Sequence, residues 1–203
     1  MSGGIPIRGD IPIPGRGEAG SSGGESGTAR PHCTILVMGV SGSGKTTIAA
    51  ALAQHLGWPF LEGDDFHPPA NVAKMRAGTP LTDEDRWPWL QAIADRLDTL
   101  KDQGQSAVVA CSALKRAYRS VLLDGRADSI LVFPRGSQPL IADRMRTRHG
   151  HFMPAALLDS QFATLEEPGP DEHPLVIDID GSRDEVIARA LDGVRRRLGP
   201  SLS

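Results

Sequence analysis

The sequence predicts an α/β fold in which a parallel sheet of five strands carries helices on both faces. Three observations lead to this fold class. Five short apolar runs, typical of strands that are buried on both faces, are spaced along the chain. Segments with apolar residues at helical spacing alternate with these runs, as expected for parallel strands joined by helical crossovers. A glycine-rich loop separates the first apolar run from the first helical segment, where such sheets bind phosphate groups.

The N-terminal stretch, residues 1–31, differs in composition from the rest of the chain. Gly, Ser and Pro dominate it, and it has no periodic apolar pattern. A segment of this composition buries too little apolar surface to offset the conformational entropy lost on folding. We therefore expect residues 1–31 to form a disordered extension and residues 32–200 to form one domain with a full core.

Composition argues against two classes of partner. The chain of 203 residues has a formal net charge of -3 and only 4% aromatic residues, so no nucleic-acid surface is expected. No apolar stretch is long enough to span a bilayer, so no membrane association is expected. Cys33 and Cys111 each border an expected strand, and buried reduced thiols indicate a cytoplasmic location.

The first expected strand, Thr34–Met38, leads into a loop with the pattern G-x-x-x-x-G-K-[ST] of a phosphate-binding P-loop, and a helix begins near Lys45. The glycines allow successive N–H groups to curl around an anion at the positive end of the helix dipole. The alternative is a chance match in a Gly/Ser-rich turn, and the strand and helix on either side argue against it. The residues expected to bind nucleotide are Gly39, Val40, Ser41, Gly42, Ser43, Gly44, Lys45, Thr46 and Thr47.

Two residues of this loop have distinct expected roles. Lys45 should reach the β- and γ-phosphates, and the Thr46 hydroxyl should bind Mg²⁺. A GTPase would need an Asn-Lys-x-Asp motif to bind guanine, but the only asparagine, Asn71, is followed by Val72. The expected cofactors are therefore ATP and Mg²⁺.

An acidic turn follows the second expected strand, residues 59–62. Asp64, Asp65 and His67 lie at the carboxyl end of this strand, where open α/β sheets place ligands. The functional interpretation gives Asp64 or Asp65 a hydrogen bond to a substrate hydroxyl and a contribution to the Mg²⁺ shell. The alternative is a solvated acidic turn in which His67 caps local backbone. The neighbouring P-loop favours the functional interpretation.

Two helices are expected next. The first is short, over residues 71–75, and the second is capped by Thr82 or Asp85, with Pro88 in its first turn. Arg86 lies near the start of the second helix, where a cation opposes the helix dipole. A partner anion would explain it, either a neighbouring carboxylate, which composition favours slightly, or a bound acid.

The remaining strands are expected at residues 107–110, 129–133 and 175–179, and the last amphipathic helix follows the final strand. Ser112 and Lys115 come directly after the strand at 107–110. Their position makes them site candidates, and a solvated basic helix start explains them equally well.

A basic segment precedes Gly150. Arg144, Arg146 and Arg148 cluster there, on a helix that is expected to return after Pro154. A mobile basic hairpin of this kind can close over ATP, exclude water and bring guanidinium charge to the transferring oxygens. The alternative is an exposed basic helix face, and the spacing alone does not distinguish the two.

These residues together resemble the bacterial-type gluconokinase family over roughly residues 34–197. The most specific matches are Gly-Asp-x-x-His-Pro, Asp-x-Asp-Arg-x-Pro-Trp-Leu and Cys-Ser-Ala-Leu-Lys, which begin at Gly63, Asp83 and Cys111. The family usually has Asp-Gly-Asp-Phe where this chain has Glu-Gly-Asp-Asp from Glu62, so Asp64 keeps the second acidic position. Further matching positions are Gly39–Thr47, Asn71, Lys74–Met75, Gly78, Pro80–Leu81, Tyr118–Arg119, Gly150–Phe152 and Gln161–Phe162.

The resemblance implies ATP-dependent phosphorylation of D-gluconate at its terminal hydroxyl, which gives 6-phosphogluconate for the pentose phosphate pathway. It implies the P-loop kinase fold of nucleoside-monophosphate and shikimate kinases, with an Arg-bearing lid, and its members are often homodimers. The implied catalytic residues are Lys45, Asp64 as the base, and Arg148, with Arg144 as a further nucleotide ligand.

Gluconate is an anion with many hydroxyls, so its pocket needs a cation and several polar groups. We expect Arg86 with Lys115 to bind its carboxylate. The full set of substrate-binding candidates is Asp64, His67, Lys74, Arg86, Lys115 and Arg119.

Two alternatives belong to other functional classes. A P-loop kinase for another small hydroxy acid, such as shikimate, is the first, but no Gly-Gly-Gly turn follows the third strand, where Ser112-Ala113-Leu114 stands. A non-catalytic ATP-binding module is the second. Such a module would have little reason to hold Asp64 and the lid arginines together.

Overall fold

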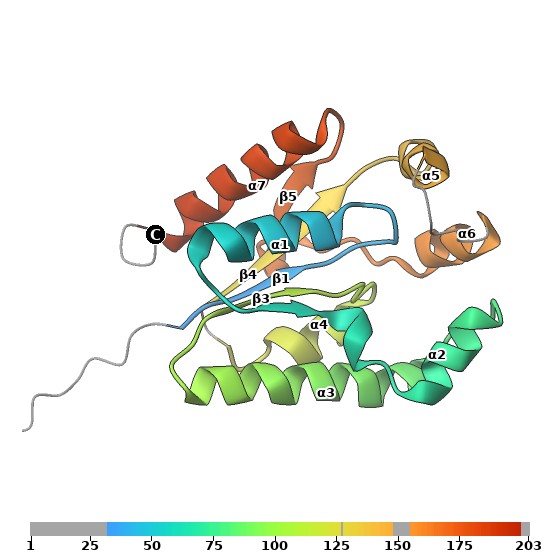
Figure 1. The fold of residues 1–203 in the computed structure, drawn as a ribbon, viewed down its shortest axis with the longest axis horizontal. Helices are drawn as coiled ribbons and strands as arrows, with labels where there is room; N and C mark the ends of the chain where they lie inside the picture. Colours follow the sequence, from blue (N-terminus) through green and yellow to red (C-terminus); the bar gives the residue numbers. More distant parts are fainter. Residues whose placement is uncertain (1–31, 127, 148–154, 200–203) are drawn as a thin grey trace, which may run out of the picture.

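The computed structural model describes residues 32–126, 128–147 and 155–199, so the extension expected over residues 1–31 lies outside the described residues. Five parallel strands form one sheet in the order β2-β3-β1-β4-β5, with helices on both faces (Figure 1), which confirms the predicted architecture. The strands are β1 (Thr34–Val37), β2 (Phe60–Glu62), β3 (Ala107–Ala110), β4 (Ser129–Arg135) and β5 (Leu175–Asp178). The helices are α1 (Lys45–Leu56), α2 (Pro69–Arg76), α3 (Asp83–Asp102), α4 (Arg116–Leu123), α5 (Gln138–Thr147), α6 (Ala155–Thr164) and α7 (Arg183–Leu198), with two 3-10 turns, η1 (Gly63–Phe66) and η2 (Pro170–Glu172).

The sheet register brings three loops to one edge. Val37 of β1 and Glu62 of β2 both lie opposite Ala110 of β3. Because the strands are parallel, the loops that follow β1, β2 and β3 leave the sheet at the same level. A hydrogen bond from the Gly39 N–H to the Ser112 carbonyl (3.1 Å) joins the first and third loops. Candidates from distant parts of the sequence therefore meet at this edge.

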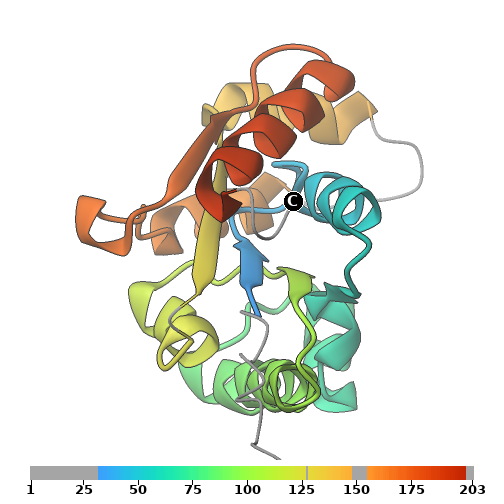
Figure 2. The same ribbon diagram turned by 90° about the vertical axis from the view of Figure 1, so that its left-hand side faces the viewer.

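The core has two halves, one on each face of the sheet. Along β1, Ile35 and Val37 pack among residues of α1 and α7, whereas Leu36 and Met38 pack among residues of α3 and α4. The two helical layers are visible on opposite sides of the sheet in Figures 1 and 2. All four side chains are fully buried. Burial on both faces explains why the strands form continuous apolar runs in the sequence.

Helix ends follow the expected chemistry with one exception. Gly57 ends α1 in the left-handed conformation (φ 68°). A capping box begins α3, because the Thr82 hydroxyl accepts from the Asp85 N–H and the Asp85 carboxylate accepts from the Thr82 N–H. The prediction that Pro88 lies in the first turn was wrong: the capping box starts the helix at Asp83, which leaves the proline inside α3.

The two cysteines are reduced and buried, as expected. Burial raises the pKa of both Cys33 and Cys111 to about 12, so neither is a thiolate at neutral pH. Both act as packed core residues rather than nucleophiles. Among the described helices, none combines the length and the apolar character that crossing a membrane requires.

Candidate active site

The loop between β1 and α1 has the backbone that phosphate binding requires. Gly39, Gly42 and Gly44 have φ values of 135°, 81° and 92°, which residues with a side chain rarely adopt. Gly44 is the N-cap of α1, so the loop ends at the unpaired N–H groups of that helix. A Cβ at Gly42 would lie 2.6 Å from the Cγ of Met145, which means that α5 packs directly on the loop. This cradle fits the triphosphate of the expected nucleotide.

The first residues of α1 lie beside an acid from β2. Lys45 lines the cavity described below, and its Nζ donates to the Val40 carbonyl (2.9 Å). Thr46 is exposed at the helix start. Burial raises the pKa of the Glu62 carboxyl, and a hydrogen bond with Thr46 opposes that rise. A hydroxyl next to a carboxylate is a set of hard oxygen donors, so the residues present fit the expected Mg²⁺.

The turn η1 is held tightly against its neighbours. A Cβ at Gly63 would lie 2.5 Å from the Ala110 carbonyl oxygen, so a side chain is excluded there. The buried Trp89 donates from its indole nitrogen to the Gly63 carbonyl (2.7 Å), and its ring stacks on His67 with a centroid distance of 4.1 Å. The backbone on both sides of the acidic turn is therefore fixed before any substrate binds.

The cavity distinguishes the two adjacent acids of this turn. Both acids are exposed, but Asp64 lines the cavity together with His67, whereas Asp65 does not. Burial lowers the pKa of His67, and Arg86 acts in the same direction while Asp64 opposes it. His67 is therefore a neutral hydrogen-bonding group at pH values near neutrality, and Asp64 is the acid placed to meet a substrate.

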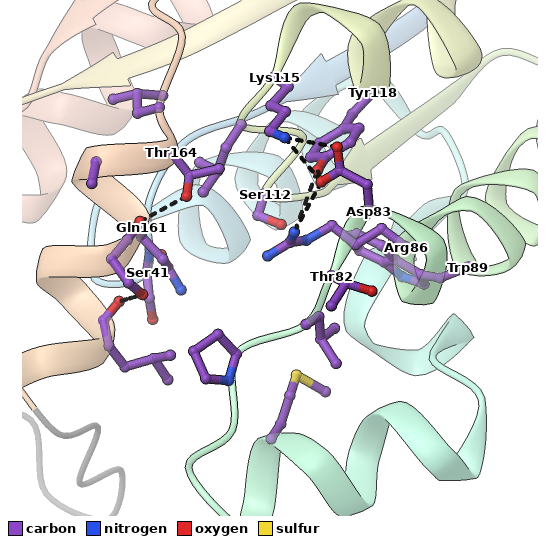
Figure 3. A pocket seen from close by; sticks show the side chains of 18 of the residues that line it. Ser41, Thr82, Asp83, Arg86, Trp89, Ser112, Lys115, Tyr118, Gln161 and Thr164 are labelled. Carbon is purple, nitrogen blue, oxygen red and sulfur yellow. Dashed lines mark hydrogen bonds and ion pairs between the residues drawn. The ribbon is translucent and has the colours of Figure 1, made fainter.

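A cavity of about 870 Å³ lies between the phosphate loop, the start of α3 and helix α6 (Figure 3). This volume is in the range of small-molecule sites. Residues that follow β1, β2 and β3 line it, so the loops at the carboxyl edge of the sheet build this cavity. The polar residues among those that line it include Ser41, Lys45, Asp64, His67, Asp83, Arg86, Ser112, Lys115, Tyr118 and Gln161.

Asp83 contacts three of these side chains, which belong to Arg86, Lys115 and Tyr118. Figure 3 shows this cluster at the cavity wall. Its carboxylate accepts from the Lys115 Nζ (2.8 and 2.9 Å) and from the Tyr118 hydroxyl (2.5 Å). Arg86 forms an ion pair with Asp83 (3.6 Å) and donates to the Tyr118 hydroxyl oxygen (3.3 Å). The neighbouring carboxylate expected for Arg86 is thus present, and the Arg86 side chain still lines the cavity.

The ionisation of this cluster follows from its contacts. The hydrogen bond from Lys115, followed by that from Tyr118, holds the pKa of Asp83 below its usual range. The same hydrogen bond from Asp83 raises the pKa of Lys115. Burial, with Asp83 second, raises the pKa of Tyr118. At neutral pH the cluster therefore contains two cations, one anion and a neutral phenol.

Two further candidates lie away from the cavity. Lys74 does not line it, because the Lys74 ammonium is held by the Asp85 carboxylate (2.6 Å). Arg144 donates to the carbonyls of Ile179 (2.5 Å) and Gly181 (2.9 Å) in the loop after β5. Arg148 lies outside the described residues, so its role as a lid residue stays a prediction.

Arg119 is the clearest correction among the substrate-binding candidates. The helix α4 begins at Arg116, so Arg119 falls on its buried face and its side chain is only 2% exposed. The guanidinium forms a paired contact with the Glu172 carboxylate (2.6 and 2.8 Å). It also donates to the carbonyls of Ala113 (3.4 Å) and Glu166 (2.9 Å). It binds the protein's own backbone and leaves no contact for substrate.

The position of Arg119 serves the site indirectly. Ala113 has a positive φ of 38° and no exposed surface, a strained conformation for a residue with a side chain. The loop that contains it carries Ser112 and Lys115 to the cavity. Arg119 donates to the carbonyls of Ala113 and Leu114, so its guanidinium braces the loop that contains the strained residue.

Among the cavity residues that the sequence assigned no role are Asp83, Tyr118 and Gln161. The Oε1 atom of Gln161, on α6, accepts a hydrogen bond from the Ser41 N–H of the phosphate loop (2.6 Å). No local pattern marks such a contact, since 120 residues separate its two partners. The only signal for these residues was that they lie in segments that resemble the gluconokinase family.

Comparisons with known sequences agree with this geometry. A family profile described as "AAA domain" matches residues 35–168. The gluconokinase of Gluconobacter oxydans is 55% identical over 138 residues, which are 68% of this chain and 78% of that protein. The thermoresistant gluconokinase of Escherichia coli is 40% identical over 84% of this chain and 98% of its own length.

Solved structures of related proteins also include a gluconokinase. The crystal structure of a gluconokinase from Sinorhizobium meliloti has a TM-score of 0.75 and 46% identity, and the match covers 82% of this chain and 93% of that one. A shikimate kinase from Acinetobacter baumannii is 20% identical, with a TM-score of 0.52 over 86% of this chain and 97% of that chain, and shares the fold alone. The chain therefore has the P-loop kinase fold and belongs to the gluconokinase family.

Proposed function

We propose that this protein catalyses the ATP-dependent phosphorylation of D-gluconate to 6-phospho-D-gluconate. The observation that carries the proposal is that one cavity joins a phosphate loop, the carboxylate of Asp64 and a cationic cluster. A phosphoryl donor, a base and an anion-binding group are the parts that phosphorylation of a sugar acid needs. The identities with gluconokinases along most of the chain support this substrate over shikimate.

The roles follow from the chemistry of each group. Asp64 orients the terminal hydroxyl of gluconate and accepts its proton as the phosphoryl group is transferred. Lys45 and the N–H groups of the loop stabilise the negative charge that moves between the phosphate oxygens. The Thr46 hydroxyl would hold Mg²⁺, which would supply positive charge to balance the phosphates. Arg148 is proposed as a further nucleotide ligand, and Arg144 as a second one once its guanidinium leaves the carbonyls of Ile179 and Gly181.

At the other end of the substrate, Arg86 and Lys115 bind the carboxylate. Arg86 donates a hydrogen bond to the Tyr118 hydroxyl, and the flat guanidinium fork has further N–H groups for a carboxylate. His67 is neutral and offers a hydrogen bond to a hydroxyl of the sugar chain. This orientation puts the charged end of gluconate at the start of α3 and its reactive hydroxyl near Asp64.

A coupled assay of ADP release tests the substrate directly. With ATP and Mg²⁺, we expect turnover with D-gluconate to exceed turnover with other sugar acids, shikimate and nucleoside monophosphates. An enzyme that turns over shikimate faster than gluconate would favour the alternative kinase. A protein that binds ATP and releases no ADP with any acceptor would be a binding module.

Substitution of Arg86 tests the carboxylate subsite. Arg86→Ala should raise the KM for gluconate about ten-fold or more, because a charge-assisted hydrogen bond to the carboxylate is lost, while the affinity for ATP stays close to wild type. Arg96→Ala is a matched control, since Arg96 is an exposed arginine on the same helix. Equal KM values in wild type and Arg86→Ala would return Arg86 to a purely structural role.

The cellular setting and assembly are further parts of the proposal. The buried reduced thiols of Cys33 and Cys111 support a cytoplasmic enzyme. The family resemblance supports a homodimer, which light scattering of the purified chain would distinguish from a monomer.

A further inference from the structure

The Asp83 cluster has a feature that the binding of gluconate alone does not explain. A site that needs only to attract a carboxylate would present its two cations unopposed. Here Asp83 contacts both cations, at 2.8 Å for Lys115 and 3.6 Å for Arg86, on the wall of the cavity itself. The Asp83 side chain is 38% exposed, so this acid is not a buried counter-ion required by desolvation of the two cations.

The contacts give the cluster a defined charge. Arg86 and Lys115 are cations, Asp83 is an anion, and Tyr118 is a neutral phenol. Lys115 contacts both oxygens of the Asp83 carboxylate, and the Tyr118 hydroxyl donates to one of them. One positive charge therefore remains, and it matches a ligand end that bears one negative charge.

The cluster is also built to keep its shape. The Tyr118 residue is 1% exposed, and its hydroxyl donates to Asp83 and accepts from Arg86. The Arg86 guanidinium lies 5.6 Å from the centroid of the Tyr118 ring, as does the Lys115 ammonium. A buried phenol thus fixes the position of both cations through one acid. A change of charge at Asp83 therefore changes the electrostatic interactions of both Arg86 and Lys115.

From these contacts we propose that Asp83 is a specificity-determining residue, which sets the net charge of the carboxylate subsite to one and so selects acceptors whose far end carries a single negative charge. This inference rests on the proposed gluconate kinase function and deepens it. It separates three acceptors that share the same hydroxyl chain and reactive terminal hydroxyl. They are D-glucitol, which is neutral at the far end, D-gluconate, which has one negative charge, and D-glucitol 1-phosphate, which has about two.

The test measures kcat/KM for these three acceptors in wild type and in Asp83→Asn. Asparagine keeps the size of the side chain and an acceptor oxygen for Lys115, while the cluster gains one positive charge. We expect the ratio of kcat/KM for D-glucitol 1-phosphate to that for D-gluconate to rise about ten-fold in the variant, as expected for one unit charge near a partly exposed ion pair. Lys115→Met removes a positive charge and should shift preference in the opposite direction, toward D-glucitol.

The double variant Asp83→Asn/Lys115→Met separates charge from positioning. It has one positive charge again, from Arg86, so the preference for a singly charged acceptor should return even though the geometry is altered twice. A ratio that is unchanged in Asp83→Asn, or a double variant that keeps the preference of either single variant, would overturn the proposal. If Asp83→Asn does not fold, Asp83→Ser, which removes the same charge and keeps a hydroxyl acceptor for Lys115, is measured in its place, and an unchanged acceptor ratio there overturns the proposal.

The outcomes also separate this inference from the proposed function. Wild-type enzyme that phosphorylates none of the three acceptors would contradict gluconate kinase activity itself. Wild-type enzyme that phosphorylates gluconate, together with variants whose acceptor ratios do not move, would leave that function in place and remove the charge selection assigned to Asp83.

Discussion

Asp64→Asn should lower kcat by about 10²–10⁴-fold, which is the range that a positioned general base contributes. The amide keeps a hydrogen bond to the acceptor hydroxyl but takes up no proton, so binding of gluconate should change much less than turnover. The affinity for ATP should stay close to wild type, since the phosphate loop is intact. Steady-state kinetics together with calorimetric titration of ATP measures both quantities.

The chain supplies a matched control for this experiment. Asp65 is the adjacent acid, is exposed and does not line the cavity, so Asp65→Asn should leave kcat close to that of wild type. Lys45→Ala is a contrasting variant, which should weaken nucleotide binding as well as turnover. A normal kcat in Asp64→Asn, or a larger loss in Asp65→Asn, would move the base away from Asp64.

Glu172→Ala should reduce the free energy of unfolding by about 3 kcal/mol or more, because it leaves the Arg119 guanidinium buried without its counter-ion. Arg119 is 2% exposed and Glu172 13% exposed in this pair. The loss should be visible as a lower midpoint in urea at an unchanged m-value. Asp171→Ala is the matched control: its pair with Arg116 is 58% exposed on both sides, so the effect there should be much smaller.

The same pair predicts a dependence on pH. The hydrogen bond from Arg119 holds the pKa of Glu172 below the ordinary glutamate value of 4.5. A depressed carboxyl pKa contributes stability that is present above the unfolded-state pKa and is lost as the pH falls through the folded-state pKa. The difference in stability between wild type and Glu172→Ala should therefore shrink below pH 4.5. A difference that is independent of pH would show that the ion pair is not its source.

Features that depend on local residue pattern were predictable from the sequence. The strands and the phosphate loop were predictable, because burial on both faces and positive φ angles leave direct marks on residue choice. Thr82 was predictable as a cap because a side-chain hydroxyl before a helix is a local preference of helix starts. Pro88 was not placed correctly, since the proline alone does not reveal where the capping box starts the helix.

The candidate site was predictable only in part, because side-chain direction depends on packing. Lys115 and Arg119 are both basic residues that follow β3, and nothing in their spacing shows that one faces the cavity and the other a buried carboxylate. The partner that decides the matter, Glu172, lies 53 residues further along the chain. Asp83 stands at the start of α3, where acids are common, and only its three-dimensional neighbours give it a different role.

The contact between Gln161 and Ser41 has a consequence for how the nucleotide enters. The Ser41 N–H already donates a hydrogen bond to the Gln161 Oε1 atom. A phosphate oxygen that accepts from this N–H must therefore displace that amide oxygen. Binding of the triphosphate at this N–H therefore breaks the hydrogen bond to Gln161 on α6. Part of the binding free energy is used to break that hydrogen bond. The contact between α6 and the phosphate loop thus depends on whether nucleotide is bound to that loop.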